Sequence, residues 1–258
     1  MIIENKKQLK KYQQAGQLST NILKQLHQAV RPGVTPLEID QLAAELCQKH
    51  DVVPSFKGAG SANNRYQYAT CVSVNDTIVH GIPNQRKFQA GDVVKVDFGL
   101  IKDGLQTDHC FTLGLAPLVA EDERLIIASR DAVQEAVKLA VVGNKTGDLG
   151  FAIQSLIEQA GFNVAKEFIG HGIGFDMHED PQLPAFGRQG KGVKLAEGMV
   201  LCVEAQVLAG DDRVVFSKDG WTVKTADGKN AAMFEYMVVV GKEKPIILTP
   251  TLNWEIIV

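Results

Sequence analysis

Two segments of this chain repeat one another, and the repeat limits how the chain can fold. Gly91–Asp97 (GDVVKVD) aligns with Gly198–Glu204 (GMVLCVE), so that glycine matches glycine and carboxylate matches carboxylate. Each copy is followed by Lys-Asp-Gly and then by a strand-like stretch with a second acid, Asp108 or Glu235. A matched strand, turn and acid indicate a duplicated unit. Because a solenoid needs more copies, we expect two related halves, at about 50–140 and 141–250.

The remaining sequence indicates helices and strands in mixed order within a single domain over residues 1–258. With 45% apolar residues, the chain can bury a substantial core. Apolar periodicity predicts helices over 9–30, 121–141 and 147–160, and another helix after 35, where Thr35, Pro36 and Glu38 form a capping-box sequence. Segments rich in valine and aromatic residues predict strands. These strands are 71–79, 92–101, 105–113, 199–209, 214–216, 221–225 and 233–240.

Charge and composition exclude several classes of protein. A formal net charge of -3 gives no reason to expect a nucleic-acid partner. The N-terminus lacks the apolar core of a signal peptide, and no run of about 18 apolar residues predicts a membrane span. The four cysteines are far apart, without CxxC spacing, so we expect reduced thiols and a cytoplasmic protein.

The acids of the first half are predicted to share one face of a hairpin. Asp103-Gly104 is typical of a two-residue hairpin loop, which places Asp97 opposite Cys110. Because strand side chains alternate, Asp108 shares the face of Cys110 and lies diagonal to Asp97, with backbones about 7–8 Å apart. Two such acids on an apolar sheet repel each other unless a proton or a cation lies between them.

Glu204 and Glu235 repeat this arrangement in the second half, each inside a stretch suited to burial. An isolated acid in a strand usually faces solvent, but four acids in valine-rich strands within a repeat favour a metal site. Carboxylates together with a histidine suit Mn, Fe, Co or Zn, and a carboxylate-bridged pair of ions about 3.5–4 Å apart is a recurring hydrolytic arrangement.

A glycine-rich segment around 168–181 supplies the histidine. His171 and His178 lie in a stretch with three glycines within five residues, which disfavours a helix and lets the backbone approach a ligand. A lone histidine is more often structural, but two histidines around this loop favour a functional role. His80 ends a strand before a turn, whereas His109 faces away from Asp108 if its strand is regular.

Together these residues resemble the type I methionine aminopeptidases, in their short bacterial form. The resemblance covers nearly the whole chain, and it rests on the following motifs: HGIP at 80–83, VDFGLIKDG at 96–104, Asp108, GHGIG with His178 and EDP at 179–181, GMVLCVEAQVLAG at 198–210, KDGWTVKT at 218–225, and Glu235. It implies the pita-bread fold of the α+β class, in which two pseudo-symmetric halves share a central antiparallel sheet with helices on its outer face.

The resemblance also implies an activity and roles for individual residues. Two divalent metal ions (Co, Mn, Fe or Zn) would activate a water molecule that attacks the first peptide bond, and Glu204 would carry its proton. His178 would stabilise the oxyanion and His80 would contact the leaving-group side. The metal ligands would be Asp97, Asp108, His171, Glu204 and Glu235, with Asp108 and Glu235 bridging. The residues of the methionine pocket would be Tyr66, Cys71, Met177 and Trp221.

The implied substrate is the N-terminus of a nascent polypeptide whose initiator methionine precedes a small residue, with the ribosome as a candidate place of encounter. We expect a monomer that binds neither nucleic acid nor membrane. The sequence departs from the family pattern at His109, Met177, Ala205, Tyr236 and the stretch 60–66, which indicates a divergent copy of the enzyme.

Two alternatives remain open at this stage. A peptidase that cleaves before proline, of the aminopeptidase P or prolidase type, would share the five ligands, although such enzymes usually carry an extra N-terminal domain. A non-catalytic peptide-binding module on the same fold is less favoured, because all five ligand positions hold residues that can bind metal.

Overall fold

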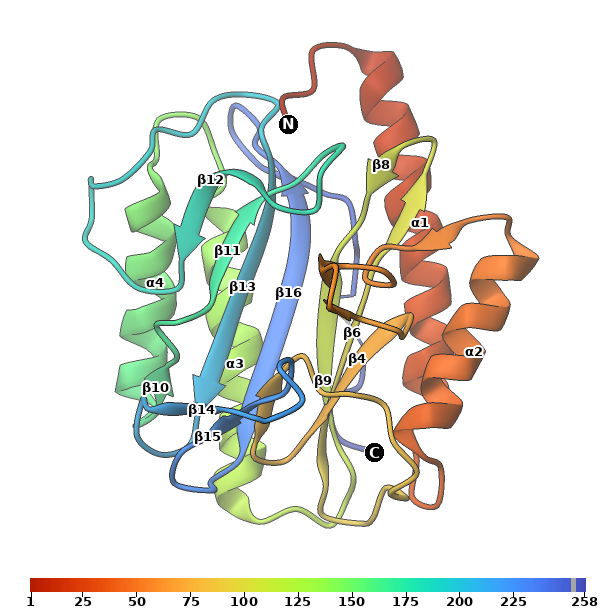
Figure 1. Cartoon of the computed structure of the whole chain (residues 1–258). Coiled ribbons are helices and arrows are strands. Elements are labelled where there is room, and N and C mark those ends of the chain that lie inside the picture. Colours follow the sequence, from red (N-terminus) through yellow and green to blue (C-terminus); the bar gives the residue numbers. More distant parts are fainter. Residues whose placement is uncertain (252–253) are drawn as a thin grey trace.

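A nine-stranded antiparallel sheet forms the centre of the computed structural model, which describes residues 1–251 and 254–258 (Figure 1). The strand order is β12-β11-β13-β16-β9-β6-β4, with β10 paired to β13 and β17 paired to β16. The strands of this sheet are β4 (Thr70–Val74), β6 (Val93–Phe98), β9 (His109–Gly114), β10 (Asn163–Val164), β11 (Ile169–Gly172), β12 (Glu179–Pro184), β13 (Val200–Leu208), β16 (Ala231–Val239) and β17 (Ile246–Ile247).

In the part of the chain that the structure describes, four helices cover one face of this sheet, behind it in the view of Figure 1. α1 (Lys6–Ala29) and α2 (Pro36–Lys49) pack near β4 and β6, while α3 (Ala120–Lys138) and α4 (Thr146–Gln159) pack near β13, β16 and β12. The predicted capping box of α2 is confirmed, because the Thr35 side chain accepts from the Glu38 amide and the Glu38 carboxylate accepts from the Thr35 amide. All four predicted helices are present.

Three of the predicted strands are interrupted in the structure. The stretch 92–101 divides at Gly99 into β6 and β7 (Leu100–Lys102), and 105–113 divides into β8 (Leu105–Gln106) and β9. A Cβ on Gly99 would lie 1.9 Å from the Thr107 carbonyl oxygen, so the two backbones cross closely where the hairpin leaves the main sheet. The stretch 71–79 divides into β4 and β5 (Thr77–Val79), which pair in different sheets.

The predicted hairpin register is confirmed despite these interruptions. Lys102 pairs with Leu105 around Asp103-Gly104, and both loop residues have positive φ, as a type I′ turn requires. The same register continues into the main sheet, where Asp97 pairs with Cys110. The acids of the first half therefore reach the same face of the sheet.

Smaller sheets border the open face. β14 (Val214–Phe216) and β15 (Val223–Thr225) continue to β5, and β1 (Val53–Pro54) joins β7 and β8. The hairpin of β2 (Gly60–Ser61) and β3 (Asn64–Arg65) reaches the turn before β15, where the Trp221 indole N–H donates to Asn64 Oδ1 over 3.0 Å. This contact joins segments that are far apart in the sequence.

The main hydrophobic core lies between the sheet and the helices. The opposite face of the sheet is therefore free to carry polar side chains. Side chains such as Val96, Phe111 and Phe234 are buried toward the helices. All four cysteines are buried free thiols, as predicted. Among the described residues, no helix is both long and apolar enough to cross a membrane.

Candidate active site

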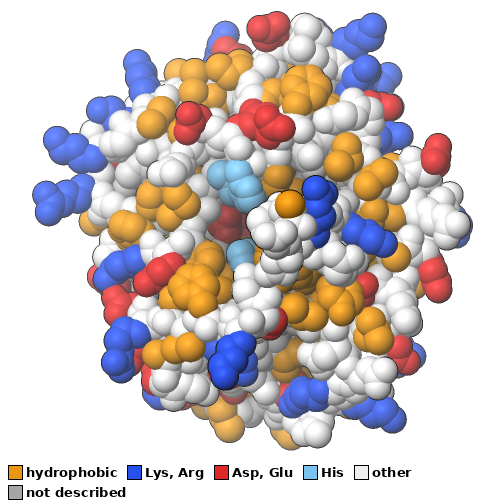
Figure 2. Space-filling model, viewed as in Figure 1, with side chains coloured by type: hydrophobic (Ala, Val, Ile, Leu, Met, Phe, Trp, Pro, Cys, Tyr) orange, Lys and Arg blue, Asp and Glu red, His pale blue; other side chains and the backbone are white. Residues whose placement is uncertain are grey.

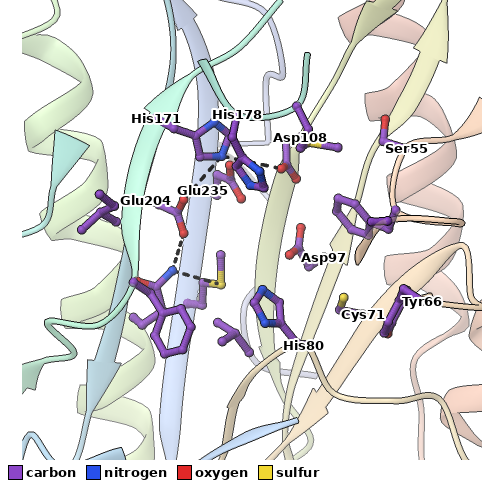
Figure 3. Close-up of a pocket in the computed structure, with 18 of the residues that line it drawn as sticks. Ser55, Tyr66, Cys71, His80, Asp97, Asp108, His171, His178, Glu204 and Glu235 are labelled. Atoms are coloured by element: carbon purple, nitrogen blue, oxygen red, sulfur yellow. Dashed lines mark hydrogen bonds and ion pairs between the residues drawn. The ribbon is translucent and has the colours of Figure 1, made fainter. Parts of the chain in front are cut away.

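A row of chemically reactive side chains crosses the open face of the sheet. Glu204 of β13 pairs with Glu235 of β16, Glu235 pairs with Cys110 of β9, and Cys110 pairs with Asp97 of β6. Directly paired residues in a sheet point to the same face. Three acids from three strands therefore point to the face away from the helices, as Figure 3 shows.

Asp108 joins this row from the interruption between β8 and β9. It is 6% exposed, and its side chain lies in hydrogen-bonding contact with Asp97. Asp97 Oδ1, Asp108 Oδ1 and Glu235 Oε1 are buried without a hydrogen-bond partner. Buried carboxylate oxygens are costly without partners, so this part of the structure is suited to a cation.

His171 completes the cluster from β11. Its Nδ1 lies 2.8 Å from the Gly172 carbonyl oxygen, so Nδ1–H donates and the lone pair is on Nε2. Nε2 is 3.9 Å from both Asp108 Oδ2 and Glu204 Oε1 (Figure 3). A backbone carbonyl that fixes the far nitrogen of a histidine in this way is typical of metal ligands.

The glycines beside His171 make room for neighbouring strands. A Cβ on Gly170 would lie 2.4 Å from the Cys202 carbonyl oxygen, and one on Gly172 would lie 2.2 Å from the Asp180 carbonyl oxygen. The sequence alone predicts that these glycines let the backbone approach a ligand. In the structure they instead admit the backbones of β13 and the β12 edge, which holds His171 against the acids.

Burial and mutual repulsion change the protonation of the cluster. Burial raises the pKa of Asp97 to about 7, and burial together with the charge of Asp97 raises the pKa of Glu204 to about 8. The pKa values of Asp108 and Glu235 are raised well above their usual range, first by burial and then by neighbouring carboxylates. Burial lowers the pKa of His171 to about 4, so the imidazole is neutral and can bind metal.

Four of these side chains can approach a single ion. Asp108, His171, Cys202 and Glu235 each offer one ligand atom, and these atoms lie within 4.8 Å of one another. Together with the unpartnered carboxylate oxygens, this donor set fits a divalent transition metal. Cys202 is not among the ligands that the sequence predicts, although it is two residues before Glu204 and thus shares its face.

A pocket of about 760 Å³ opens above the acids. Figure 2 shows the hollow, with histidine and acidic side chains at its bottom and apolar side chains around it. His80 and His178 both line it, from opposite sides in Figure 3, and the His178 ring is 4.5 Å from the His171 ring. His80 has φ 54°, a conformation that non-glycine residues seldom adopt and that is frequent at functional sites.

All four residues predicted for the methionine pocket line this cavity: Tyr66, Cys71, Met177 and Trp221. Tyr66 is buried, and its ring lies 5.1 Å from the Trp221 ring. The structure adds lining residues that the sequence does not predict, because which side chains of distant segments meet at the cavity depends on the fold. These residues are Ser55, Phe56, Phe168, Gln206 and Met233.

Three of the departures from the family pattern lie outside the pocket. His109, Ala205 and Tyr236 are each adjacent to an acid in sequence, so they point to the helix-covered face. As predicted, His109 faces away from the cluster; its Nε2 lies 2.9 Å from Ser19 Oγ, and it is fully buried. Ala205 and Tyr236 belong to the main core. Met177 lines the pocket, as do Gly60 and Tyr66 of the divergent stretch 60–66.

Comparison with known proteins identifies the family. The model of metallopeptidase family M24 matches residues 10–242. The chain belongs to metallopeptidase family M24. Among M24 relatives, the methionine aminopeptidase of Clostridium perfringens is 39% identical over 249 residues, which cover 96% of this chain and 98% of that protein. Methionine aminopeptidase 1 of Bacillus subtilis is 34% identical and covers 96% of this chain.

Solved M24 structures share the fold. The crystal structure of the methionine aminopeptidase of Thermotoga maritima superposes with a TM-score of 0.92 at 38% identity, over 96% of this chain and 99% of that one. The X-Pro aminopeptidase of the same organism has a TM-score of 0.74 at 21% identity, and only 64% of that chain is covered. The predicted pita-bread fold is thereby confirmed. Membership of M24 and the buried donor cluster support binding of divalent metal.

Proposed function

We propose that this M24 protein removes the initiator methionine from polypeptides. The observation that carries the proposal is the convergence of Asp97, Asp108, His171, Glu204 and Glu235 on one buried face, at the floor of a pocket. Relatives named methionine aminopeptidase match this chain over almost its full length, so the same activity is the simplest inference for it.

These five residues would hold two divalent ions, with Asp108 and Glu235 shared between them. The position of Asp108 supports this sharing, because Asp108 lies beside Asp97 on one side and 3.9 Å from His171 Nε2 on the other. When bound, such ions lower the pKa of water and polarise a carbonyl group. Co, Mn, Fe and Zn all suit a set of carboxylates and one imidazole.

Other side chains would handle the proton and the substrate. Glu204 is buried among the other donors at the floor of the pocket, so its carboxylate is placed to take up the proton of an attacking water molecule. Gln206 Nε2 donates to Glu204 Oε2 and holds the carboxylate in place. His178 and His80 flank the pocket at positions from which they can contact the carbonyl oxygen and the leaving-group side of a bound peptide.

The methionine side chain would occupy the part of the cavity lined by Tyr66, Cys71, Met177 and Trp221. Tyr66 and Trp221 form an edge-to-face aromatic pair, which is a favourable surface for a thioether. The Tyr66 hydroxyl lies 2.9 Å from the Thr70 carbonyl oxygen, so its polar end is satisfied away from the ligand.

We further propose a single catalytic domain built from related halves at about 50–140 and 141–250. The antiparallel pairing of β13 with β16 and of β6 with β9 supports this. The first pairs Glu204 with Glu235, and the second brings Asp97 near Asp108, which directly precedes β9. The protein would act in the cytoplasm as a monomer, on the N-termini of nascent polypeptides, with the ribosome as a candidate place of encounter. We expect neither nucleic acid nor membrane as a partner.

The two alternatives receive less support. The X-Pro aminopeptidase neighbour is longer than this chain and only 21% identical to it, so that likeness concerns the fold alone. A binding module without activity does not account for the retention of all five donors and of the buried oxygens without hydrogen-bond partners.

A peptide assay tests the proposed function. Purified protein with added Mn²⁺ or Co²⁺ is incubated with Met-Ala-Ser and, separately, with an Xaa-Pro peptide. We expect release of methionine from Met-Ala-Ser only. Cleavage of the proline peptide alone would assign the chain to the other M24 activity, and inactivity on both peptides without bound metal would favour the binding module.

A further inference from the structure

We infer that Cys202 is a ligand of the bound metal and makes this site softer than one built from carboxylates and imidazole alone. The inference rests on the metal site of the proposed function and adds a donor to it. Cys202 lies on β13, and the strand pairing places it opposite both His171 of β11 and Met237 of β16. It is fully buried on the same face as the acids.

The distances allow the thiol to share an ion with its neighbours. The ligand atoms of Asp108, His171, Cys202 and Glu235 lie within 4.8 Å of one another, although the structure holds no ion. Ligand atoms that surround one zinc ion tetrahedrally at about 2.0–2.3 Å are about 3.3–3.7 Å apart. Side-chain rotations that close the present separations by up to about 1 Å would therefore bring all four into contact with one ion.

Two further observations point to a cation at this position. Asp108 Oδ1 and Glu235 Oε1 are buried and accept no hydrogen bond. A metal ion would supply the positive partner that both oxygens lack. The Cys202 side chain is also in hydrogen-bonding contact with Glu235, so the thiol is directed at the cluster. On binding, the thiol would release its proton to solvent, because the thiolate is the form that ligates metal.

Another cysteine of this face is not placed in this way. Cys110 lies between Asp97 and Glu235 in the row, but its Sγ is 3.8 Å from the Met233 carbonyl oxygen and 3.6 Å from that of Phe111. Cys110 thus provides a matched control, since it is equally buried and on the same face, with its thiol turned to backbone carbonyls.

A thiolate changes which metal the site prefers. Thiolates favour Zn²⁺ and other softer ions, whereas carboxylates and water suit Mn²⁺. Replacing Cys202 should therefore weaken binding of Zn²⁺ by about tenfold or more, and binding of Mn²⁺ much less. A cysteine that only fills space would leave the ratio of the two affinities unchanged.

The test uses the full chain loaded with Co²⁺, with the absorption spectrum as the readout. We expect a near-ultraviolet thiolate-to-cobalt charge-transfer band in the wild type and in Cys110→Ser, and its loss in Cys202→Ser with Co²⁺ still bound. Equilibrium competition between Zn²⁺ and Mn²⁺ gives the affinity ratio for the same variants. A band that persists in Cys202→Ser, or is absent from Co²⁺-loaded wild type, overturns the inference.

A second measurement on the wild type alone makes the result independent of how the variant folds. X-ray absorption of the Zn²⁺-loaded protein should detect a sulfur neighbour at about 2.3 Å, and a shell of nitrogen and oxygen only would overturn the inference. The Met-Ala-Ser assay is run on the same wild-type sample. Cleavage without a sulfur ligand refutes the role of Cys202 alone, whereas a protein that binds no metal refutes the proposed function itself.

Discussion

Glu204 of β13 lies directly opposite Glu235 of β16, so two buried carboxylates form a cross-strand pair in the middle of the sheet. Like charges in this arrangement destabilise a sheet unless a proton or a cation compensates them. Ligand binding, and not the stability of the fold, therefore explains why two acids are paired here.

Glu204→Gln should abolish peptide cleavage and weaken metal binding, yet make the metal-free protein more stable near pH 8. The substitution removes a buried group whose pKa is raised to about 8, and with it the repulsion from neighbouring acids. A gain of about 1 kcal/mol corresponds to an increase of roughly 2–4 °C in Tm. Calorimetry of chelator-treated protein measures it. An equal or lower Tm for the metal-free variant would contradict the role of repulsion.

His171→Ala and His178→Ala should separate metal binding from catalysis. His171 directs Nε2 at Asp108 and Glu204, whereas His178 lies beside it at the pocket wall. We expect His171→Ala to bind at least about tenfold less metal at limiting concentration. His178→Ala should retain its metal and lose about 10²–10⁴-fold in kcat. Metal analysis of the two purified variants checks the assignment, and loss of metal from His178→Ala would reverse it.

The stability of the metal-free protein should fall between about pH 6.5 and pH 8. The folded-state pKa values of Asp97 and Glu204, about 7 and 8, exceed the unfolded values of 3.8 and 4.5, and those of Asp108 and Glu235 are raised still further. The native state therefore holds more protons than the unfolded state, and each such acid lowers the free energy of unfolding by up to about 1.4 kcal/mol per pH unit.

Groups with lowered pKa values act in the opposite direction, in other parts of the pH range. The buried histidines oppose the acids mainly below pH 6.5, and Lys95, whose pKa burial lowers to about 7, opposes them above pH 7. Four acids outweigh one lysine. Urea unfolding at several pH values measures the slope, which saturating metal should reduce. A metal-free protein that becomes more stable from pH 6.5 to pH 8 would refute the raised pKa values.

Gly172→Ala should destabilise the fold by at least about 1–3 kcal/mol, which is the usual cost of overpacking. Its Cβ would lie 2.2 Å from a backbone oxygen of Asp180, and backbone cannot move aside easily. Gly187→Ala is the control, because its nearest neighbour would be 3.2 Å away. Equal Tm values for the two variants would show that the strand approach at Gly172 is not tight.

Much of the local structure could be predicted from the sequence, since it depends on neighbours in the chain. The capping box at Thr35 and Glu38, the Asp103-Gly104 turn and the pairing of Asp97 with Cys110 all follow from short-range rules. The alternation of side chains along a strand also predicts correctly that His109 points away from the acids, toward the helices. Each of these inferences requires only the side-chain period or a turn type.

The features that were missed depend on contacts between distant segments. The interruption at Gly99 comes from the close approach of Thr107, and the glycines beside His171 serve the approach of β12 and β13. Cys202 enters the donor cluster because β11 and β16 lie on either side of it. Periodicity gives the face of a residue but not the strand beside it, so these relationships appear only in three dimensions.

Anomalous diffraction from crystals of the Mn²⁺-loaded protein tests most directly how the metal is held. The proposed site consists of Asp97, Asp108, His171, Glu204 and Glu235, which together would hold two ions. It predicts two anomalous peaks about 3.5–4 Å apart among these side chains, with Asp108 and Glu235 between them. A crystal soaked to saturation that shows no peak there, or peaks only elsewhere on the protein, would contradict it.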